Sequence, residues 1–263
     1  MKSRRESMNT GNKLQLPDVA IFTFCWGTEH VEKSLRSMLV AMDQVDFKRA
    51  ALITDSSKTN MSMFSSVIDR HNIDVYDMKA DLNDNLQNDD ANRVGFNQLF
   101  IDETNKHMTD DFCLNVQHDS TVINSSLWNP EFLRYDYVAA PWPMNIIQAS
   151  DMVAGRIAKI PNVVGNGGFS LRTRKYVEES AKLDWLHKNE DLNICVFNYE
   201  NMVSKGIKFA PPYLASEFAV EHPVPEKVFA RSLLFTYNSF GFHGDFNPAG
   251  MKFIEKYDLG ENL

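Results

Sequence analysis

The 263-residue sequence is poor in cysteine, glycine and proline, with 3, 12 and 10 residues of each. Cys25, Cys113 and Cys195 lie far apart and form no CxxC pair. This spacing excludes a disulfide framework and predicts reduced, buried thiols. The low glycine and proline content excludes a collagen-like chain and argues against a mostly disordered one. These scarcities favour a globular protein with a large core.

Long hydrophobic runs are also missing from the sequence. The longest strongly apolar stretches reach about eight residues, whereas a membrane-spanning helix needs about 20. The first 13 residues are polar and carry Lys2, Arg4 and Arg5, and no apolar segment follows that could form the core of a signal peptide. We therefore expect no membrane span and a cytoplasmic location.

Positive charge is in short supply. Lys and Arg number 27 against 35 Asp and Glu, which gives a formal net charge of −8. Proteins that bind nucleic acid over a wide surface normally show a basic balance, so this composition disfavours such a function. Only a local basic patch would overcome it, and the candidates are Arg172, Arg174, Lys175, Lys205 and Lys208.

Short apolar runs alternate with amphipathic segments over the first half of the chain. The pattern predicts strands at residues 19–26, 50–54, 73–77 and 111–116. It predicts helices at residues 31–42, 60–70 and 92–106, the first of them capped by Thr28, and a polar loop at 81–92. This order predicts an α/β fold, a doubly wound sheet with helices on both faces. The N-terminal half is expected to be Rossmann-like, and the C-terminal half less regular.

No internal repeat and no Pro/Ser/Gly-rich linker divides the sequence. We expect a flexible polar lead at residues 1–16 and a single domain at residues 17–263. In doubly wound sheets, ligands bind beyond the carboxyl ends of the strands. That rule directs attention to the predicted strand ends at residues 27–29, 55–57 and 117–120.

Asp119 directly follows a predicted strand, with Gln117 before it and Ser120 after it. A carboxylate flanked by oxygen donors suits a hard divalent cation that keeps open positions for phosphate oxygens. One acid alone is a weak set of ligands, however, and the same residues equally suit the cap of a turn. The residues by themselves leave both interpretations open.

The glycine-rich segment at residues 164–172 reads Val-Gly-Asn-Gly-Gly-Phe-Ser-Leu-Arg. Glycines so placed allow a ligand to approach the backbone closely, or they form a tight turn. The segment matches neither the P-loop nor the GxGxxG pattern. Arg93 and Arg172 are further candidates for binding phosphate. Arg172 suits the solvated face of a helix equally well.

Two further features have both a chemical and a structural interpretation. Glu190 and Asp191 form a pair in which one carboxylate could act as general base, although acids at a helix start are also favoured by the helix dipole. His243 lies in a Gly/Phe segment, where its imidazole is either packed or free to bind a metal or phosphate. No GxSxG sequence surrounds Ser170, which argues against nucleophilic hydrolysis.

The order of these segments is more specific than any one of them. Gln-His-Asp-Ser at 117–120 is followed by Tyr-Asp-Tyr-Val-Ala-Ala-Pro-Trp at 135–142, the glycine-rich segment, Glu-Asp at 190–191, Ala-Ser-Glu-Phe-Ala-Val-Glu at 215–221 and Gly-Phe-His at 241–243. This series resembles a GT-A-like glycosyltransferase family long catalogued only as a domain of unknown function. The resemblance covers residues 111–244, and the part before it matches in architecture alone.

The resemblance implies a role for each matching residue. Asp119 and His243 would bind Mn²⁺ or Mg²⁺ at the donor's diphosphate, with Gln117 in place of the first acid of the DXD element. Asp191 would be the catalytic base, with Glu190 as second choice. The nucleoside would lie over the first strand end, near residues 23–28 and Asp55. Ala139 stands where the family usually has glycine. The substrate-binding residues implied are Thr23, Gly27, Thr28, Asp55, Arg93, Gln117, Trp142, Asn166, Gly167, Gly168 and Arg172.

The activity implied is transfer of a sugar from a nucleotide-sugar donor to an acceptor hydroxyl, with inversion because a base candidate is present. A glycan or small molecule is favoured as the acceptor. A modified DNA base is a third-ranked acceptor, since the net charge of −8 opposes it. The alternative of a different class is a catalytically silent GT-A-like module that binds a nucleotide or glycan.

Overall fold

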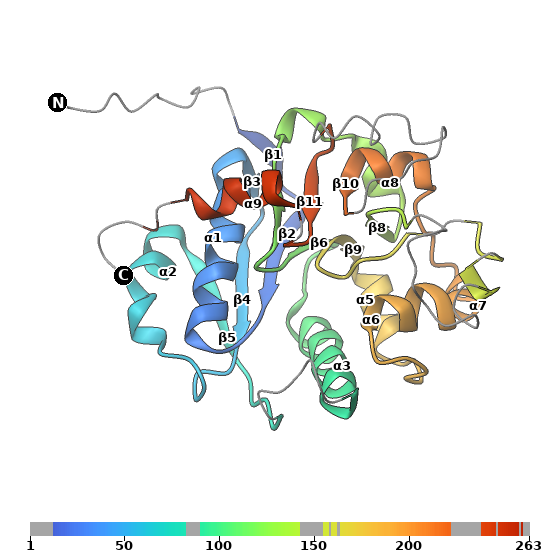
Figure 1. Ribbon diagram of the computed structural model, residues 1–263, viewed down its shortest axis with the longest axis horizontal. Coiled ribbons are helices and arrows are strands. Elements are labelled where there is room, and N and C mark those ends of the chain that lie inside the picture. The colour runs from blue at the N-terminus through green and yellow to red at the C-terminus, as the bar shows by residue number, and fades with distance from the viewer. Residues whose placement is uncertain are drawn as a thin grey trace.

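The computed structural model describes residues 13–82, 90–142, 155–157, 159–161, 164–221, 238–245, 247–257 and 259 (Figure 1). Most of the predicted polar lead therefore lies outside the described residues. Its end does not, because Leu14–Leu16 forms strand β1, which pairs in parallel with β3 (Val45–Phe47). Residues 14–16, predicted as part of the lead, are therefore part of a strand.

A six-stranded sheet forms the centre of the molecule, in the order β5-β4-β2-β6-β9-β8. Its strands are β5 (Ile73–Asp77), β4 (Ala50–Thr54), β2 (Val19–Phe24), β6 (Phe112–Val116), β9 (Phe169–Thr173) and β8 (Tyr137–Ala139). The first four strands are parallel, and β9 runs antiparallel to both β6 and β8. The carboxyl ends of β2 and β6, which pair directly, therefore lie at the same edge of the sheet.

Helices cover both faces of this sheet, as the alternation of segments predicts. They are α1 (Thr28–Gln44), α2 (Ser65–His71), α3 (Asp90–His107), α5 (Arg174–Ser180), α6 (Glu190–Leu192), α7 (Tyr199–Ser204), α8 (Pro212–Phe218) and α9 (Pro248–Glu255). Short helical turns occur at η1 (Met61–Met63), η2 (Ser125–Leu127), η3 (Pro130–Arg134) and the π-helical η4 (Asn193–Phe197). Helix α9 lies against α1 (Figure 1).

The two faces have separate hydrophobic clusters. Ile21 of β2 packs with α1 residues such as Leu35, whereas the next residue, Phe22, packs with α3 and α5 residues such as Phe100 and Tyr176. Successive side chains of a strand point to opposite faces, so a strand covered on both faces must be apolar at every position. This is why β2 reads as a continuous apolar run with all six residues buried.

A second, three-stranded sheet joins distant parts of the chain and has no signal in the sequence. It consists of β10 (Ala219–Val220), β11 (Gly241–His243) and β7 (Ser120–Val122). Strand β11 pairs antiparallel with β7, which places His243 opposite Ser120. The backbone therefore brings the late histidine next to the end of β6.

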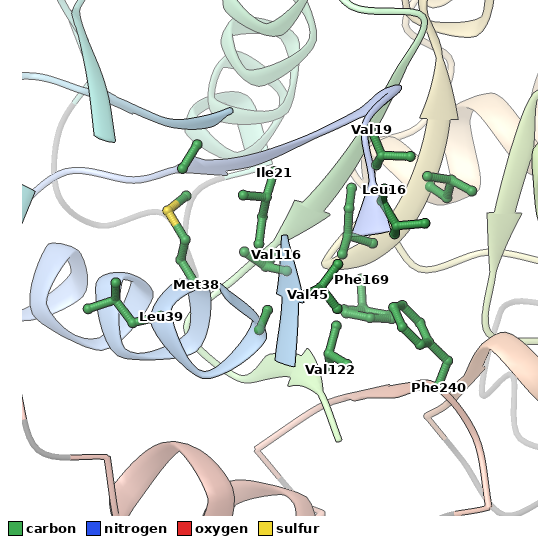
Figure 2. Packing of buried hydrophobic residues seen from close by; sticks show 14 of the residues in the cluster. Leu16, Val19, Ile21, Met38, Leu39, Val45, Val116, Val122, Phe169 and Phe240 are labelled. Carbon is green, nitrogen blue, oxygen red and sulfur yellow. The ribbon is translucent and has the colours of Figure 1, made fainter. Parts of the chain in front are cut away.

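Aromatic packing joins the two sheets. The ring of Phe169, on β9, lies 5.2 Å from that of Phe218 and 6.2 Å from that of Phe240, measured between centroids. Figure 2 shows Phe169 and Phe240 next to each other. A Cβ on Gly241 would lie 2.2 Å from the Phe169 ring, so glycine is needed there to admit the aromatic side chain.

The structure corrects the predicted start of the first helix. Thr28 is the first helical residue, and the N-cap is Gly27, whose φ of 85° lies in the region that favours glycine. The three cysteines are buried and unpaired, as their spacing predicts. No helix within the described residues combines the length and apolar character that crossing a membrane requires.

We expect Phe169→Ala to lower the free energy of unfolding by about 3–5 kcal/mol, because it leaves a cavity between the two sheets. Urea denaturation followed by circular dichroism measures the loss. Val203→Ala is the control, since Val203 is 45% exposed and the change should stay within about 0.5 kcal/mol. Equal losses in the two variants would contradict this account of the core.

Candidate active site

A cavity of about 520 Å³ opens at the carboxyl ends of β2 and β6. Its walls come from the β2–α1 turn, from α3, from the segment after β6, and from the glycine-rich segment before β9. The start of α6 and the end of β11 complete it. The residues that line it include Phe24, Cys25, Trp26, Gly27, His30, Ser34, Lys58, Arg93, Phe96, Asn97, Gln117, His118, Asn166, Gly167, Gly168, Asn189, Glu190, Asp191 and His243.

Most of the residues singled out in the sequence lie in this wall. The structure brings together Gly27, Arg93, Gln117, Asn166, Gly167, Gly168, Glu190, Asp191 and His243. Asp119 is not in the lining but lies beside His243, with 3.5 Å between its Oδ1 and His243 Nε2. Five predicted contacts are not in the cavity lining, and each has another partner or environment: Thr23, Thr28, Asp55, Trp142 and Arg172.

Asp55 is occupied by the turn that follows β4. One carboxylate oxygen accepts hydrogen bonds from the backbone N–H and hydroxyl of Ser57, and the other accepts from the backbone N–H of Ala80. Burial alone would raise the pKa of Asp55, but these hydrogen bonds lower it below its usual value. The carboxylate therefore closes a turn rather than facing the cavity.

The two threonines predicted near the nucleoside are also elsewhere. Thr28 accepts a hydrogen bond from the backbone N–H of Asn60 and so ties the start of α1 to the segment after β4. Thr23 is fully buried within β2. The wall beyond β2 is instead aromatic: Trp26 packs against Phe24 and Phe96, with ring centroids 5.8 and 5.2 Å away.

The glycine-rich segment forms the floor of the cavity. Asn166 adopts a φ of 88°, and its side-chain oxygen accepts hydrogen bonds from the backbone N–H groups of Gly168 and Phe169. A Cβ on Gly167 would lie 2.2 Å from Glu190 Oε2, and one on Gly168 would lie 2.2 Å from His243 Nε2. The two glycines thus allow the Glu190 carboxylate and the His243 imidazole to lie directly against the floor.

Arg172 is buried in the protein core beside this floor, which corrects its predicted role as a substrate contact. Its guanidinium is inaccessible to solvent and forms an ion pair with Glu190 at 2.9 Å. It lies near the rings of Phe100, Tyr137 and Tyr176, at 4.8, 5.7 and 5.7 Å from their centroids. A cation in this position cannot belong to a basic surface.

The rest of the predicted basic patch is also weakened by local partners. Arg174 forms an ion pair with Glu178 at 2.8 Å, and Lys175 donates a hydrogen bond to the backbone oxygen of Gly206. Lys205 and Lys208 are exposed. The local cluster that a polyanionic acceptor would require thus loses its central member, Arg172.

Asp191 follows Glu190 in the first turn of α6 and lines the cavity. Burial is the main cause that raises the pKa of Asp191 to about 7, and the neighbouring charges of Glu190 and Glu221 add to it. A carboxylate with a pKa near neutrality is suited to accept a proton from a hydroxyl group. Glu190 is 3% exposed and paired with Arg172, so Asp191 is the freer of the two acids.

Asp119 and His243 form a second pair of titratable side chains beside the floor. The Oδ1 atom of Asp119 is buried without a hydrogen-bond partner, and His243 Nε2 lies 3.5 Å from it. The second ring nitrogen, Nδ1, lies 3.2 Å from Oε1 of Glu221. Burial would lower the pKa of His243, but the hydrogen bond to Glu221 and the charge of Asp119 raise it overall.

Glu221 is the residue of this site that sequence reasoning missed. It ends the segment at 215–221 that supports the resemblance, but its partners lie 22 and 79 residues away along the chain. Its Oε2 accepts a hydrogen bond from Trp142 Nε1 at 3.1 Å. Trp142 therefore contacts Glu221 although it does not line the cavity. His30 and His118, whose ring centroids lie 5.8 Å apart, line the cavity itself and were not predicted to do so.

The donor set around Asp119 fits a divalent cation. An orphaned carboxylate oxygen and an imidazole nitrogen suit Mn²⁺, and the side-chain oxygen of Gln117 lies on the same side of Gly168. Within the part of the chain that the structure describes, no group of three or more His, Cys, Asp or Glu gathers as a complete metal site. The remaining positions would be left for phosphate oxygens.

Comparison with known proteins identifies the family and the fold. The profile of a family described as "Protein of unknown function (DUF5672)" matches residues 82–243. No curated protein matches the chain in sequence. Among solved structures, the galactosyltransferase LgtC, in complex with donor and acceptor sugar analogues, aligns with a TM-score of 0.53 and 11% identity, over 90% of this chain and 94% of its own.

A second structure gives the same result. The apo-form glycosyltransferase GlyE of Streptococcus pneumoniae TIGR4 aligns with a TM-score of 0.51 and 13% identity, over 94% of this chain and 61% of the GlyE chain. At such identities the likeness establishes the fold and not the activity. The GT-A-like glycosyltransferase fold expected from the motifs is therefore confirmed.

We expect Asp191→Asn to stabilise the protein at pH 8 and to have a smaller effect at pH 5. Because the pKa of Asp191 is raised to about 7, the folded state binds a proton that the unfolded state releases near pH 4. The stability of the wild type therefore falls as pH rises from about 4 to 7, by at most about 4 kcal/mol from this group. Asparagine does not titrate, so the variant escapes this loss.

Thermal unfolding of both proteins between pH 5 and 8 measures the effect, with the pH 5 value as an internal control. A melting-temperature difference that stays constant over this range would show that Asp191 does not carry the raised pKa.

Proposed function

This chain belongs to the DUF5672 family, and from that premise we propose that it is a glycosyltransferase. It would move a sugar from a nucleotide-sugar donor to an acceptor hydroxyl. The observation that carries the proposal is the arrangement of one cavity. Asp191, with a pKa near 7, and His243 line it together with Gly167 and Gly168, and Asp119 lies 3.5 Å from His243.

Asp191 would act as the general base. Transfer requires removal of a proton from the acceptor hydroxyl as it attacks the anomeric carbon, and a positioned base contributes typically 10²- to 10⁴-fold. The neighbouring Glu190 forms an ion pair with Arg172, and this contact would keep Asp191 at the cavity wall. A base on the acceptor side favours an inverting reaction, because a direct displacement reverses the configuration of the sugar.

Asp119 and His243 would hold a divalent cation, Mn²⁺ or Mg²⁺, with Gln117 beside them. Such a cation, when bound, stabilises the charge that develops on the nucleoside diphosphate as it leaves. Arg93 lines the same cavity and would contact the phosphates. Holding both substrates in one cavity would supply further rate enhancement through positioning.

The donor's nucleoside would lie near the turn after β2, where Gly27 and the aromatic side chains of Trp26 and Phe96 line the cavity. Flat aromatic rings are suited to stacking on a nucleobase. The likeness to LgtC, whose structure holds donor and acceptor sugar analogues, supports the proposal of a glycosyltransferase at the level of the fold. A glycan or small molecule is the favoured acceptor, because Arg172 is removed from the basic patch that a modified DNA base would require.

We expect a nucleotide sugar to raise the melting temperature of the protein in the presence of Mn²⁺, since a ligand that binds only the folded state stabilises it by mass action. A thermal-shift screen over UDP-, GDP-, ADP- and TDP-sugars, with Mn²⁺ or excess EDTA, measures the effect. The response and the slow hydrolysis of the same donor should both disappear in EDTA. Full turnover in EDTA would contradict the role of the metal.

We expect Asp191→Asn to keep donor binding but to lower transfer or donor hydrolysis by 10²- to 10⁴-fold, because the amide cannot accept the proton. Isothermal titration and a nucleotide-release assay separate the two effects. Asp184→Asn is the matched control, since Asp184 is exposed and outside the cavity lining. Undiminished turnover of Asp191→Asn would assign the base elsewhere. Donor binding without any turnover in the wild type would instead favour a silent binding module.

A further inference from the structure

The imidazole of His243 lies between two carboxylates. Its Nδ1 atom is 3.2 Å from Glu221 Oε1, and its Nε2 atom is 3.5 Å from Asp119 Oδ1. Strand pairing sets this arrangement, because β11 runs alongside β7 and the backbone N–H of Gly244 donates to the backbone oxygen of Asp119 at 2.9 Å. The ring is thus held with one nitrogen toward each acid.

Glu221 is itself held from two directions. Its Oε2 accepts a hydrogen bond from Trp142 Nε1, while its backbone oxygen accepts one from the side chain of Asn247. The same Asn247 amide donates to the backbone oxygen of His243 at 2.5 Å. The side chains of Glu221 and His243 are 11% and 17% exposed, so water competes little for these contacts.

Trp142 has little freedom to move away from Glu221. Its indole lies so close to Gly165 that a Cβ on that residue would come within 2.0 Å of the ring. On the other side of the imidazole, Gly168 leaves room at Nε2, where a Cβ would come within 2.2 Å. The surroundings therefore fix the Nδ1 side of the ring and leave the Nε2 side open toward Asp119.

We propose that Glu221 is a positioning residue for the divalent-cation site: it accepts the Nδ1–H of His243 and so directs Nε2 toward Asp119. Trp142 acts one step further out by holding Glu221. Histidines that bind metals generally donate their other ring N–H to a carboxylate or carbonyl, which fixes the ring and makes the free nitrogen a better ligand. The inference rests on the proposed function, because the cation is the one that transfer would use.

The test is the affinity for Mn²⁺, measured by electron paramagnetic resonance on the full chain in the presence of UDP, GDP or ADP in turn. We expect Glu221→Gln to weaken Mn²⁺ binding by about 10- to 100-fold. Trp142→Phe keeps an aromatic ring over Gly165 but removes the Nε1 donor, and should weaken binding in the same direction by a smaller factor. Thermal unfolding checks that each variant is folded.

Two comparisons separate positioning from a general structural effect. Glu131→Gln, which removes an exposed acid paired with Arg134, should leave Mn²⁺ affinity unchanged. In a His243→Gln background, Glu221→Gln should weaken binding no further, because a residue that acts through His243 has nothing left to position.

The outcomes distinguish this inference from the proposed function. A folded Glu221→Gln protein with Mn²⁺ affinity within twofold of the wild type would overturn the inference while leaving the glycosyltransferase assignment intact. Equal weakening by Glu221→Gln with and without His243 would also overturn it. A wild-type protein that binds no Mn²⁺ with any of the three nucleotides would overturn both the inference and the metal part of the proposed function.

Discussion

The buried ion pair between Arg172 and Glu190 is the interaction on which the site depends. Arg172 lies on β9 with no exposure to solvent, and a charge in such a position is destabilising unless it is paired. Glu190 supplies the partner from the first turn of α6, which ties that helix to the sheet. The position of Asp191 follows, because it is the next residue in the chain and cannot move independently of Glu190. Removing either charge would leave the other buried and unpaired.

The same pair also sets the chemistry of its neighbour. The negative charge of Glu190 adds to burial in raising the pKa of Asp191 to about 7, so the acid that faces the cavity is poised between its two protonation states. Gly167 makes this geometry sterically feasible, since any side chain there would collide with the Glu190 carboxylate. The glutamate that pairs with the buried arginine thus also raises the pKa of Asp191, which lines the cavity.

The sequence predicts the parts of this structure whose signals are local. The apolar run at β2 and the residues after β6 led directly to the sheet and to the cavity that its strand ends form. Arg172 is a residue for which local signals fail. Next to Arg174 and Lys175 in the sequence, it is expected to be a surface charge. Its burial becomes evident only from its place on a strand that is covered on both faces. Glu221 was missed for a related reason, because its partners Trp142 and His243 are brought to it by strands that no local pattern marks.

The acidic side chains around the glycine floor follow one electrostatic rule. Acidic side chains gather there in a protein that is already negatively charged, and each described acid of the group has a cation or a donor beside it: Glu190 has Arg172, and Glu221 has His243 and Trp142. Asp119 Oδ1 and Glu190 Oε1 are both buried without a hydrogen bond, but Glu190 Oε1 lies 2.9 Å from the Arg172 guanidinium, whereas Asp119 Oδ1 is 3.5 Å from an imidazole that Glu221 also contacts. Folding would not favour an orphaned carboxylate oxygen unless something binds it. The cation of the proposed function would supply a partner for Asp119, and this argument does not depend on the motif in which Asp119 lies.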